Sequence, residues 1–309
     1  GICNLIKQVS ATNSTILVTG ETGVGKEVIA RFIHSQSPRR NEPFLAVNCA
    51  ALPPNLIESE LFGHEKGSFT SAEMTRIGRF EAADKGTLLL DEISELDQKL
   101  QAKLLRVLDT RTFERVGSSV SKRTDTRIIA TSNVDLNTHI KDKLFRHDLY
   151  FRLNVIPIHI PPLRERRADI GPLIQYFLAK HCHENQIVLK SFDDDAMKLL
   201  SDYHWPGNVR ELSNIIERAV NCVSNQTITS EEILPWLTTD ETPIHSNQLV
   251  GVPLEKIEQM AIVSNLKHFG GNRRQTAEIL AISPRTLREK IKTYNIERAV
   301  EKEKDYGTG

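Results

Sequence analysis

The stretch that decides the fold is Ile16–Glu27, which reads Ile-Leu-Val-Thr-Gly-Glu-Thr-Gly-Val-Gly-Lys-Glu. Its first four residues are mostly β-branched, which is typical of a short strand. The spacing GxxxxGK follows at Gly20, Gly25 and Lys26, and Val24–His34 then has helical spacing. A glycine-rich turn between a strand and a helix surrounds phosphate oxygens with backbone N–H groups. The stretch therefore predicts a nucleotide-binding P-loop, against the alternative of a glycine-rich turn with a surface lysine.

The whole loop is expected to contact the nucleotide. Its residues are Gly20, Glu21, Thr22, Gly23, Val24, Gly25, Lys26 and Glu27. Glu27 departs from the general motif, which has a Ser or Thr whose hydroxyl binds Mg²⁺. A carboxylate cannot act as that hydroxyl ligand, so the predicted ATP and Mg²⁺ require another acidic residue.

That acid is found at the end of an apolar run, Leu88-Leu-Leu-Asp-Glu92. Asp91 is the candidate ligand of Mg²⁺, and Glu92 is the candidate base that polarises the attacking water. Adjacent residues of a strand point to opposite faces, so we expect the two carboxylates to have different roles. The alternative is an ordinary strand end with solvated acids.

The first half of the chain alternates apolar strand-like runs with helical segments. The predicted strands are Ile16–Thr19, Phe44–Val47, Gly86–Asp91, Arg127–Ser132 and Val155–Ile160. Continuous apolar strands separated by helices predict an α/β fold with a parallel sheet that is covered on both faces. We assign residues 1–165 to this domain.

After this domain the pattern becomes helical. The helical segments are Asp169–Cys182, Asp193–Tyr203, Asn208–Val223 and Ser230–Leu237. We predict a small all-helical domain at residues 166–238 and a polar linker at 239–253. Residues 254–309 are assigned to a third, all-α domain.

The third domain has the pattern of a helix-turn-helix. Asn272–Ala281 reads as a helix and Pro284–Lys292 begins the next, with Ser283 suited to its N-cap. Apolar residues are spaced to pack the two helices together: Ala277, Leu280, Ile282, Leu287 and Ile291. A further apolar stripe is made by Leu254, Ile257, Met260 and Ala261, which suits either pairing of two chains or an intramolecular core.

Basic residues are concentrated in this domain. Eight Lys or Arg stand against three Glu between Lys267 and Arg298, in a chain whose formal net charge is zero. The candidate contacts with base edges and phosphates are Arg285, Thr286, Arg288 and Lys292. Arg273 and Arg274 are expected to contact phosphates. The domain is therefore predicted to bind double-stranded DNA, and the alternative is a solvated basic helical bundle.

Composition excludes several other classes of protein. The four cysteines form no CxxC pair, which disfavours a disulfide framework or a zinc site and favours a reducing cytoplasm. No apolar run approaches the ~20 residues of a membrane span, so no membrane partner is expected. The first residue is Gly and no signal-peptide pattern follows, which is consistent with a fragment in which any N-terminal regulatory region is missing.

Several long motifs in the same order resemble those of the bacterial enhancer-binding proteins, the AAA+ activators of sigma-54 RNA polymerase. Beside the P-loop, in which Glu27 is normal for that family, the motifs lie at Glu58–His64, Phe145–Leu153, Pro161–Arg166 and Trp205–Leu212. The resemblance covers nearly the whole chain. It implies an AAA+ P-loop NTPase core, a helical lid and a Fis-type helix-turn-helix domain.

The resemblance also implies roles for two asparagines. Asn48 looks like the polar switch that holds the catalytic Glu92. Asn133 looks like the sensor that detects the γ-phosphate.

Three arginines are similar to charged residues of the family's nucleotide site. Arg146 and Arg152 resemble the paired arginine fingers that reach into a neighbouring subunit's site, and Arg210 resembles the second sensor in the lid. A positive charge supplied by a neighbour makes phosphoryl transfer depend on assembly. Without the resemblance, surface ion pairs would be the preferred interpretation of all three.

The segment Gly67–Ala72 corresponds to the loop that contacts sigma-54 in this family. It reads Gly-Ser-Phe-Thr-Ser-Ala, whereas the family usually has Gly-Ala-Phe-Thr-Gly-Ala. The contact-making pair, Phe69 and Thr70, is kept. Ser68 and Ser71 differ from the family pattern, and Ser71 lacks the freedom to adopt a positive φ that glycine has at this position in the family.

Two functions from different classes remain. The first is an ATP-dependent activator that binds DNA upstream of promoters and remodels sigma-54 RNA polymerase for open-complex formation. It is expected to act as a ring, with a hexamer suggested by the family, and to carry dimeric DNA-binding domains. The alternative is a DNA-binding regulator with nucleotide-controlled assembly that does not remodel sigma-54. The helix-turn-helix disfavours a general AAA+ remodeller of other proteins.

Overall fold

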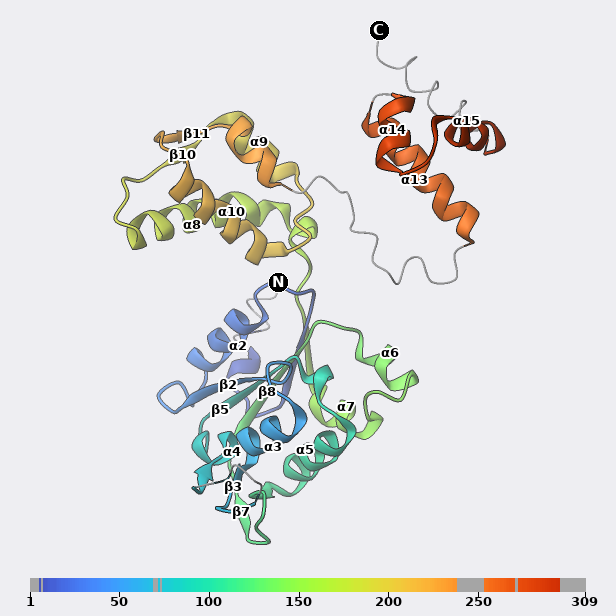
Figure 1. Ribbon diagram of the computed structural model, residues 1–309. Helices are drawn as coiled ribbons and strands as arrows, with labels where there is room; N and C mark the ends of the chain where they lie inside the picture. Colours follow the sequence, from blue (N-terminus) through green and yellow to red (C-terminus); the bar gives the residue numbers. More distant parts are fainter. Residues whose placement is uncertain are drawn as a thin grey trace. The chain divides into compact units, whose positions relative to one another are not determined.

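The computed structural model describes residues 6, 8–68, 72, 74–237, 253–269 and 272–294 (Figure 1). The chain divides into two compact units, Gly1–Leu237 and Thr238–Gly309. The predicted linker lies outside the described residues except for Pro253. The divisions that the sequence predicts at residues 165, 238 and 253 stay predictions.

The first unit is built on a five-stranded parallel sheet with the order β2-β5-β8-β1-β9. Its strands are β1 (Ile16–Thr19), β2 (Phe44–Asn48), β5 (Thr87–Asp91), β8 (Arg127–Ser132) and β9 (Ile156–His159). The parallel sheet is confirmed, and each strand ends within one residue of its prediction. Because β8 lies at the centre, the segments that follow β1 and β5 flank its carboxyl end.

Helices cover both faces of this sheet. They are α2 (Lys26–Ser35), α3 (Pro54–Phe62), α4 (Arg79–Ala82), α5 (Gln98–Thr110), α6 (Leu136–Lys141) and α7 (His147–Leu153). A short 3-10 helix, η1 (Ile93–Glu95), follows β5. One hydrophobic core joins α3, α5 and α7 to one face, and another joins α2 to the opposite face.

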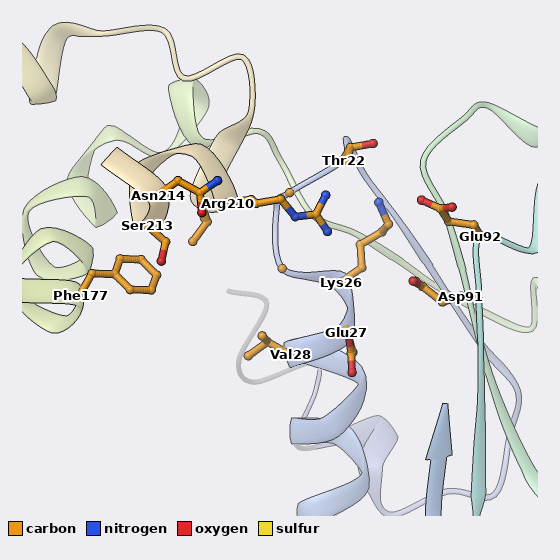
Figure 2. A pocket seen from close by; sticks show the side chains of 13 residues that line it. Thr22, Lys26, Glu27, Val28, Asp91, Glu92, Phe177, Arg210, Ser213 and Asn214 are labelled. Carbon is orange, nitrogen blue, oxygen red and sulfur yellow. The ribbon is translucent and has the colours of Figure 1, made fainter. Parts of the chain in front are cut away.

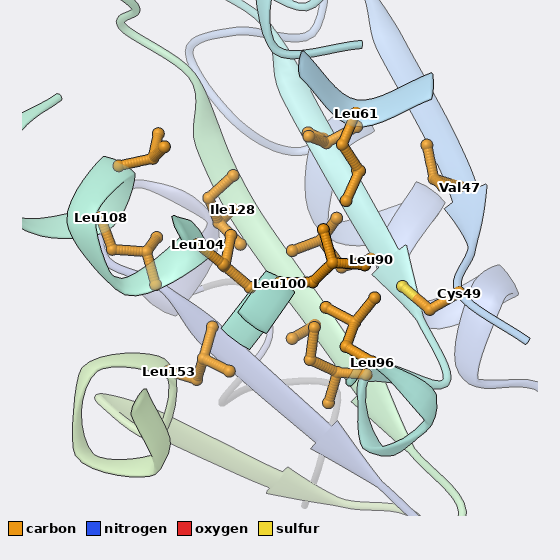
Figure 3. Close-up of a cluster of buried hydrophobic side chains, with 14 of the residues drawn as sticks. Val47, Cys49, Leu61, Leu90, Leu96, Leu100, Leu104, Leu108, Ile128 and Leu153 are labelled. Carbon is orange, nitrogen blue, oxygen red and sulfur yellow. The ribbon is translucent and has the colours of Figure 1, made fainter. Parts of the chain in front are cut away.

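Helix α5 illustrates how the sequence fixes this packing. Asp97 caps the helix by accepting a 2.7 Å hydrogen bond from the backbone N–H of Leu100. Leu100, Leu104 and Leu108 recur every four residues, so they form one apolar face. Figure 3 shows these three side chains directed at the sheet, where Leu90 of β5 is fully buried.

Two small hairpins extend from the core. The first is β3 (Gly63–His64) with β4 (Arg76–Ile77), and the second is β6 (Thr112–Glu114) with β7 (Ser121–Arg123). The hairpins are joined through the backbone, because Glu65 N–H donates to the Val116 carbonyl at 3.0 Å. The predicted sigma-54 contact residues, Phe69 and Thr70, lie outside the described residues.

The second half of this unit is a helical lid. Its helices are α8 (Ile170–Glu184), α9 (Asp194–Asp202), α10 (Asn208–Cys222) and α11 (Ser230–Ile233), with 3-10 helices η2 (Leu163–Glu165), η3 (Arg167–Asp169) and η4 (Leu234–Trp236). The prediction of an entirely helical lid was incomplete. A two-stranded parallel ladder joins β10 (Ser191–Phe192) to β11 (Thr227–Ile228), because Phe192 and Ile228 pack into the lid core.

The second unit contains α13 (Leu254–His268), α14 (Arg273–Ile279) and α15 (Pro284–Thr293). The predicted helix-turn-helix is confirmed by α14 and α15. Ser283 caps α15 by accepting a 3.0 Å hydrogen bond from Thr286 N–H, and Pro284 occupies the first turn. Its core contains Ile262, Leu266, Ala277, Leu287 and Ile291. Within the described residues, no helix is long and apolar enough to cross a membrane.

Candidate active site and DNA-binding helices

The P-loop has the backbone that its glycines predict. Gly20, Gly23 and Gly25 have φ angles of 152°, 81° and 100°, which side chains disfavour. A Cβ atom on Gly23 would lie 2.3 Å from the carbonyl oxygen of Gly207 in the lid. The loop therefore needs glycine both for its turn and for its close approach to the lid.

Lys26 begins α2 and is buried. Its Nζ donates to the carbonyl oxygens of Gly20 at 2.8 Å and Glu21 at 3.0 Å. Burial lowers the pKa of Lys26, whereas the nearby carboxylates of Asp91 and Glu92 act in the opposite direction. The ammonium group thus closes the loop and lies where phosphate oxygens are expected to bind.

A cavity of about 320 Å³ opens beside the loop (Figure 2). It is lined by Thr22, Gly23, Gly25, Lys26, Glu27, Val28, Asp91, Glu92, Phe177, Val209, Arg210, Ser213 and Asn214. Lys26, Asp91 and Glu92 come from the core, whereas Arg210 comes from the lid. On the lid side, Phe177 and Val209 supply apolar surface and Ser213 and Asn214 supply hydrogen-bonding groups, a combination that suits a base. The sequence did not single out these four lid residues, because helical periodicity does not reveal which residues of a lid helix face the nucleotide site.

Asp91 and Glu92 both line this cavity, so the expectation of opposite faces was wrong. Asp91 ends β5, but Glu92 has φ 56° and ψ 53° and is no longer part of the strand. This left-handed backbone turns the second carboxylate toward the same side, as Figure 2 shows. Thr131 contacts both residues: its hydroxyl donates to Asp91 Oδ1 at 2.5 Å and accepts from Glu92 N–H at 3.0 Å.

The chemistry of Asp91 fits Mg²⁺. In nucleotide sites Mg²⁺ takes one or two carboxylates together with phosphate oxygens and waters. Among the residues that the structure describes, no three His, Cys, Asp or Glu side chains are grouped to hold a metal ion. An Mg²⁺ ion at Asp91 would therefore depend on the phosphates of a nucleotide.

The two candidate asparagines lie at the carboxyl ends of β2 and β8, the two strands that flank β5. Asn48 pairs in register with Asp91, but its Oδ1 accepts from Ala50 N–H at 2.8 Å, and no hydrogen bond joins it to Glu92 in the described structure. Asn133 follows β8, and its Nδ2 donates to Thr22 Oγ1 of the P-loop at 3.4 Å. The switch and sensor roles stay predictions.

The two candidate arginine fingers lie on or next to α7, and within the described chain neither lines the cavity. Arg146 forms two hydrogen bonds with Asp148, at 2.6 and 3.0 Å, and this contact raises its pKa. Arg152 pairs with Asp109 at 3.0 Å. All four side chains are at least 42% exposed, so these pairs leave the arginines accessible to another subunit.

Arg210 lies on α10 and lines the cavity, with its guanidinium directed toward Lys26 (Figure 2). Its backbone N–H donates to the Gly23 carbonyl at 3.2 Å. At the other end of the loop, Glu27 pairs with Arg31 at 2.7 Å. The buried side chain of Val24 packs in the core beside the loop.

Glu21 differs from its P-loop neighbours, because its side chain faces the lid. Its carboxylate accepts two hydrogen bonds from Arg164, at 2.6 and 2.8 Å, and one from Asn208 at 3.1 Å. The contact with Arg164 lowers the pKa of Glu21 to about 2. Both partners belong to motifs seen in the sequence, but nothing in the sequence paired them with Glu21.

The basic residues of the second unit form a face on α15. Arg285, Arg288 and Lys292 are exposed at a spacing of three and four residues, opposite the buried Leu287 and Ile291. Arg285 pairs with Glu289 at 3.3 Å, but its side chain is 90% exposed, so all three cations remain accessible to a DNA groove.

The remaining candidate DNA contacts differ in exposure. Thr286 is half-buried and shares a 2.8 Å hydrogen bond with Ser283. Arg273 and Arg274 are exposed in the first turn of α14. Met260 is 55% exposed, so it does not belong to the intramolecular core that the apolar stripe suggested as one alternative.

A parallel sheet with a P-loop after β1, two acids at the end of β5 and a helical lid defines an AAA+ P-loop NTPase, joined in this chain to a helix-turn-helix. Comparison with known families agrees. The sigma-54 interaction domain matches residues 1–159, the AAA+ ATPase lid domain residues 164–248, and the Fis family of bacterial regulatory proteins residues 253–294. The chain belongs to the bacterial sigma-54-dependent transcriptional activators.

Named relatives support this membership. The transcriptional regulatory protein FlbD of Caulobacter vibrioides is 46% identical over 309 residues, which cover 95% of this chain and 68% of FlbD. The regulatory protein AtoC of Escherichia coli is 46% identical over 306 residues, which cover 96% of this chain and 66% of AtoC. The structure of NtrX from Brucella abortus in complex with ADP is 35% identical, with a TM-score of 0.71, and the match covers 94% of this chain and 67% of NtrX. The chain thus spans about two thirds of these relatives.

Proposed function

We propose that this chain hydrolyses ATP in an assembly of several subunits and uses the energy to remodel sigma-54 RNA polymerase at promoters whose upstream DNA it binds. One observation carries the proposal: the cavity contains Lys26, Asp91, Glu92 and Arg210, while Arg146 and Arg152 lie outside it. A site that lacks its arginine fingers until another subunit supplies them would link hydrolysis to assembly.

The residues of the cavity have distinct roles in this proposal. Lys26 neutralises the outer phosphates, and Glu92 accepts a proton from the attacking water. Mg²⁺ held by Asp91 would supply positive charge to the phosphate oxygens. Arg210 binds nucleotide from the lid of its own chain, and Asn133 reports the γ-phosphate through Thr22. The published complexes of NtrX with ADP and with ATP support a nucleotide as ligand.

Two further parts of the chain are proposed to contact sigma-54 and DNA. The segment Gly67–Ala72 contacts sigma-54 through Phe69 and Thr70, and the match to the sigma-54 interaction domain supports this assignment. The exposed basic face of α15 binds DNA and concentrates the protein near the promoter. A hexameric ring with paired DNA-binding domains is the assembly that we propose.

The test is capture of purified sigma-54 by this chain in the presence of ADP with aluminium fluoride, which mimics the transition state. Capture that requires the nucleotide mimic is expected, and Lys26→Ala should abolish it. ATP turnover is measured in parallel. Turnover without any nucleotide-dependent capture would contradict remodelling and favour a DNA-binding regulator whose assembly is controlled by nucleotide.

A further inference from the structure

Thr131 lies beside both acids of the candidate active site, Asp91 and Glu92. It belongs to the central strand β8, fully buried, and pairs in register with Val18 of β1. On its other side, β8 pairs with β5 up to Ala130 and Leu90. The next residue along β5 is Asp91, so the strand order brings the Thr131 hydroxyl against the acidic end of β5.

The hydroxyl of Thr131 is used twice. A threonine hydroxyl has one proton to donate and lone pairs to accept. Thr131 donates to Asp91 Oδ1 at 2.5 Å and accepts the backbone N–H of Glu92 at 3.0 Å. One carboxylate oxygen of Asp91 is thereby fixed, and within the described residues the second carboxylate oxygen makes no hydrogen bond.

The hydrogen bond from the Glu92 N–H holds Glu92 in an unfavourable backbone conformation. Glu92 is a non-glycine residue with φ 56° and ψ 53°, a conformation that costs about 1–2 kcal/mol. This conformation is what turns the Glu92 side chain into the cavity beside Asp91. Because the Thr131 hydroxyl accepts the Glu92 N–H, it stabilises this turn relative to an extended backbone that would continue β5.

We propose that Thr131 is a positioning residue, which orients the carboxylate of Asp91 and holds the backbone of Glu92 so that both acids face the nucleotide. The inference rests on the proposed ATP hydrolysis at this site. The competing explanation is that Thr131 is merely a buried polar side chain whose hydroxyl has found partners.

The test compares Thr131→Val, which removes only the hydroxyl, with Thr131→Ser, which keeps it. Loss of a group that orients a metal ligand usually lowers activity by about 10- to 100-fold, and we expect this loss in kcat for T131V. T131S should retain most of the activity. Nucleotide affinity without Mg²⁺ should change less than about threefold, whereas the strengthening of binding by Mg²⁺ should largely disappear.

Thr126→Val is the matched control. Thr126 is also buried, and its hydroxyl donates to the Ala83 carbonyl at 3.2 Å. It precedes the opposite end of β8, so the same substitution there should lower stability without changing kcat or the effect of Mg²⁺. Equal losses of kcat in T126V and T131V would overturn the proposal.

Failure of the proposed function and failure of the role of Thr131 give different results. A wild-type chain that does not hydrolyse ATP contradicts the proposed function, whereas active wild type with fully active T131V contradicts only the role of Thr131. If T131V does not fold, Thr131→Ala is compared with T131S by Mg²⁺-dependent nucleotide binding. Identical binding by T131A and T131S then overturns the inference.

Discussion

The guanidinium of Arg164 and the carboxylate of Glu21 form two parallel hydrogen bonds, at 2.6 and 2.8 Å. Arg164 lies at the start of the lid region and Glu21 lies in the P-loop. Asn208 of the lid adds hydrogen bonds to the Glu21 carboxylate and to the Thr22 carbonyl, both at 3.1 Å. The loop that is expected to hold phosphates is therefore held by the lid, and movement of either part affects the other.

Replacing Arg164 by alanine should weaken this contact. We expect a loss of about 1 kcal/mol, which corresponds to a Tm lower by about 2–4 °C, because the pair is partly exposed. If the Arg164–Glu21 contact contributes the same free energy to nucleotide binding, its loss raises the Kd for ADP about fivefold. Thermal denaturation and calorimetric titration measure both effects. Arg106→Ala, which removes an exposed pair with Glu114, is the control and should leave the Kd unchanged.

The pKa of Glu21 gives a pH dependence with a defined sign. The folded-state pKa is about 2 against an ordinary value of 4.5, mainly because Arg164 hydrogen-bonds to the ionised carboxylate. The stabilisation is thus complete above pH 4.5 and is lost as the pH falls from 4.5 towards 2. Urea denaturation should show wild type more stable than Glu21→Gln at pH 7, with the difference shrinking below pH 4.5. A difference that stays constant down to pH 3 would contradict this account.

Glu92→Gln should separate binding from hydrolysis. The amide has nearly the same shape but cannot accept the proton of the attacking water, so kcat should fall by about 10²- to 10⁴-fold. ADP and ATP should bind within about threefold of the wild-type affinity, because the substitution keeps the shape of the site. Phosphate release and calorimetry provide the two measurements. Glu95→Gln, three residues along and outside the cavity lining, should hydrolyse ATP normally; unimpaired turnover by E92Q would refute the assignment of the base.

Arg146→Ala and Arg152→Ala should each reduce turnover by about 10³-fold if the arginine acts in a neighbouring site. Mixing either variant with Glu92→Gln should restore part of the activity. The E92Q subunit then supplies its arginines to a neighbour whose own Glu92 is intact. Turnover is measured across mixing ratios.

The control for this mixture is a chain that carries both Glu92→Gln and the same arginine substitution. It has no arginine to supply, so it should restore nothing. Equal activity in both mixtures would argue against a role between subunits.

The basic face of α15 predicts a salt-dependent contact with DNA. Arg288→Ala should weaken binding and, if the residue meets a phosphate, lower the slope of log Kd against log salt by about one. Fluorescence anisotropy over a range of salt concentrations measures this slope. Lys290→Ala removes a charge from the same helix, but Lys290 pairs with Glu258 at 2.6 Å, so it should mainly change stability. A larger loss of affinity in K290A than in R288A would contradict the assignment of this face.

Local chemistry explains why much of the site was predictable from the sequence. The P-loop is recognised because only glycine readily adopts the φ angles of Gly20, Gly23 and Gly25, and because a strand and a helix flank it. The α15 cap at Ser283 and Pro284 is equally local. Such features depend on the conformation of a few consecutive residues, so spacing and residue type are enough to predict them.

The tertiary structure alone decided how distant residues meet. Glu21 and Arg164 are separated by 143 positions, and only the packing of the lid on the P-loop brings them together. Thr131 contacts Asp91 because β8 lies beside β5. Its hydroxyl also accepts from Glu92 N–H, where a left-handed backbone places Glu92 on the same side as Asp91 instead of on the opposite face of the strand. The sequence by itself therefore determined the phosphate loop, the acidic strand end and the helix-turn-helix. Strand order and the packing of the lid determined which other side chains contact the phosphate loop and the acidic strand end. Neither can be read from one segment, because strand order and lid packing follow from burial of the whole core.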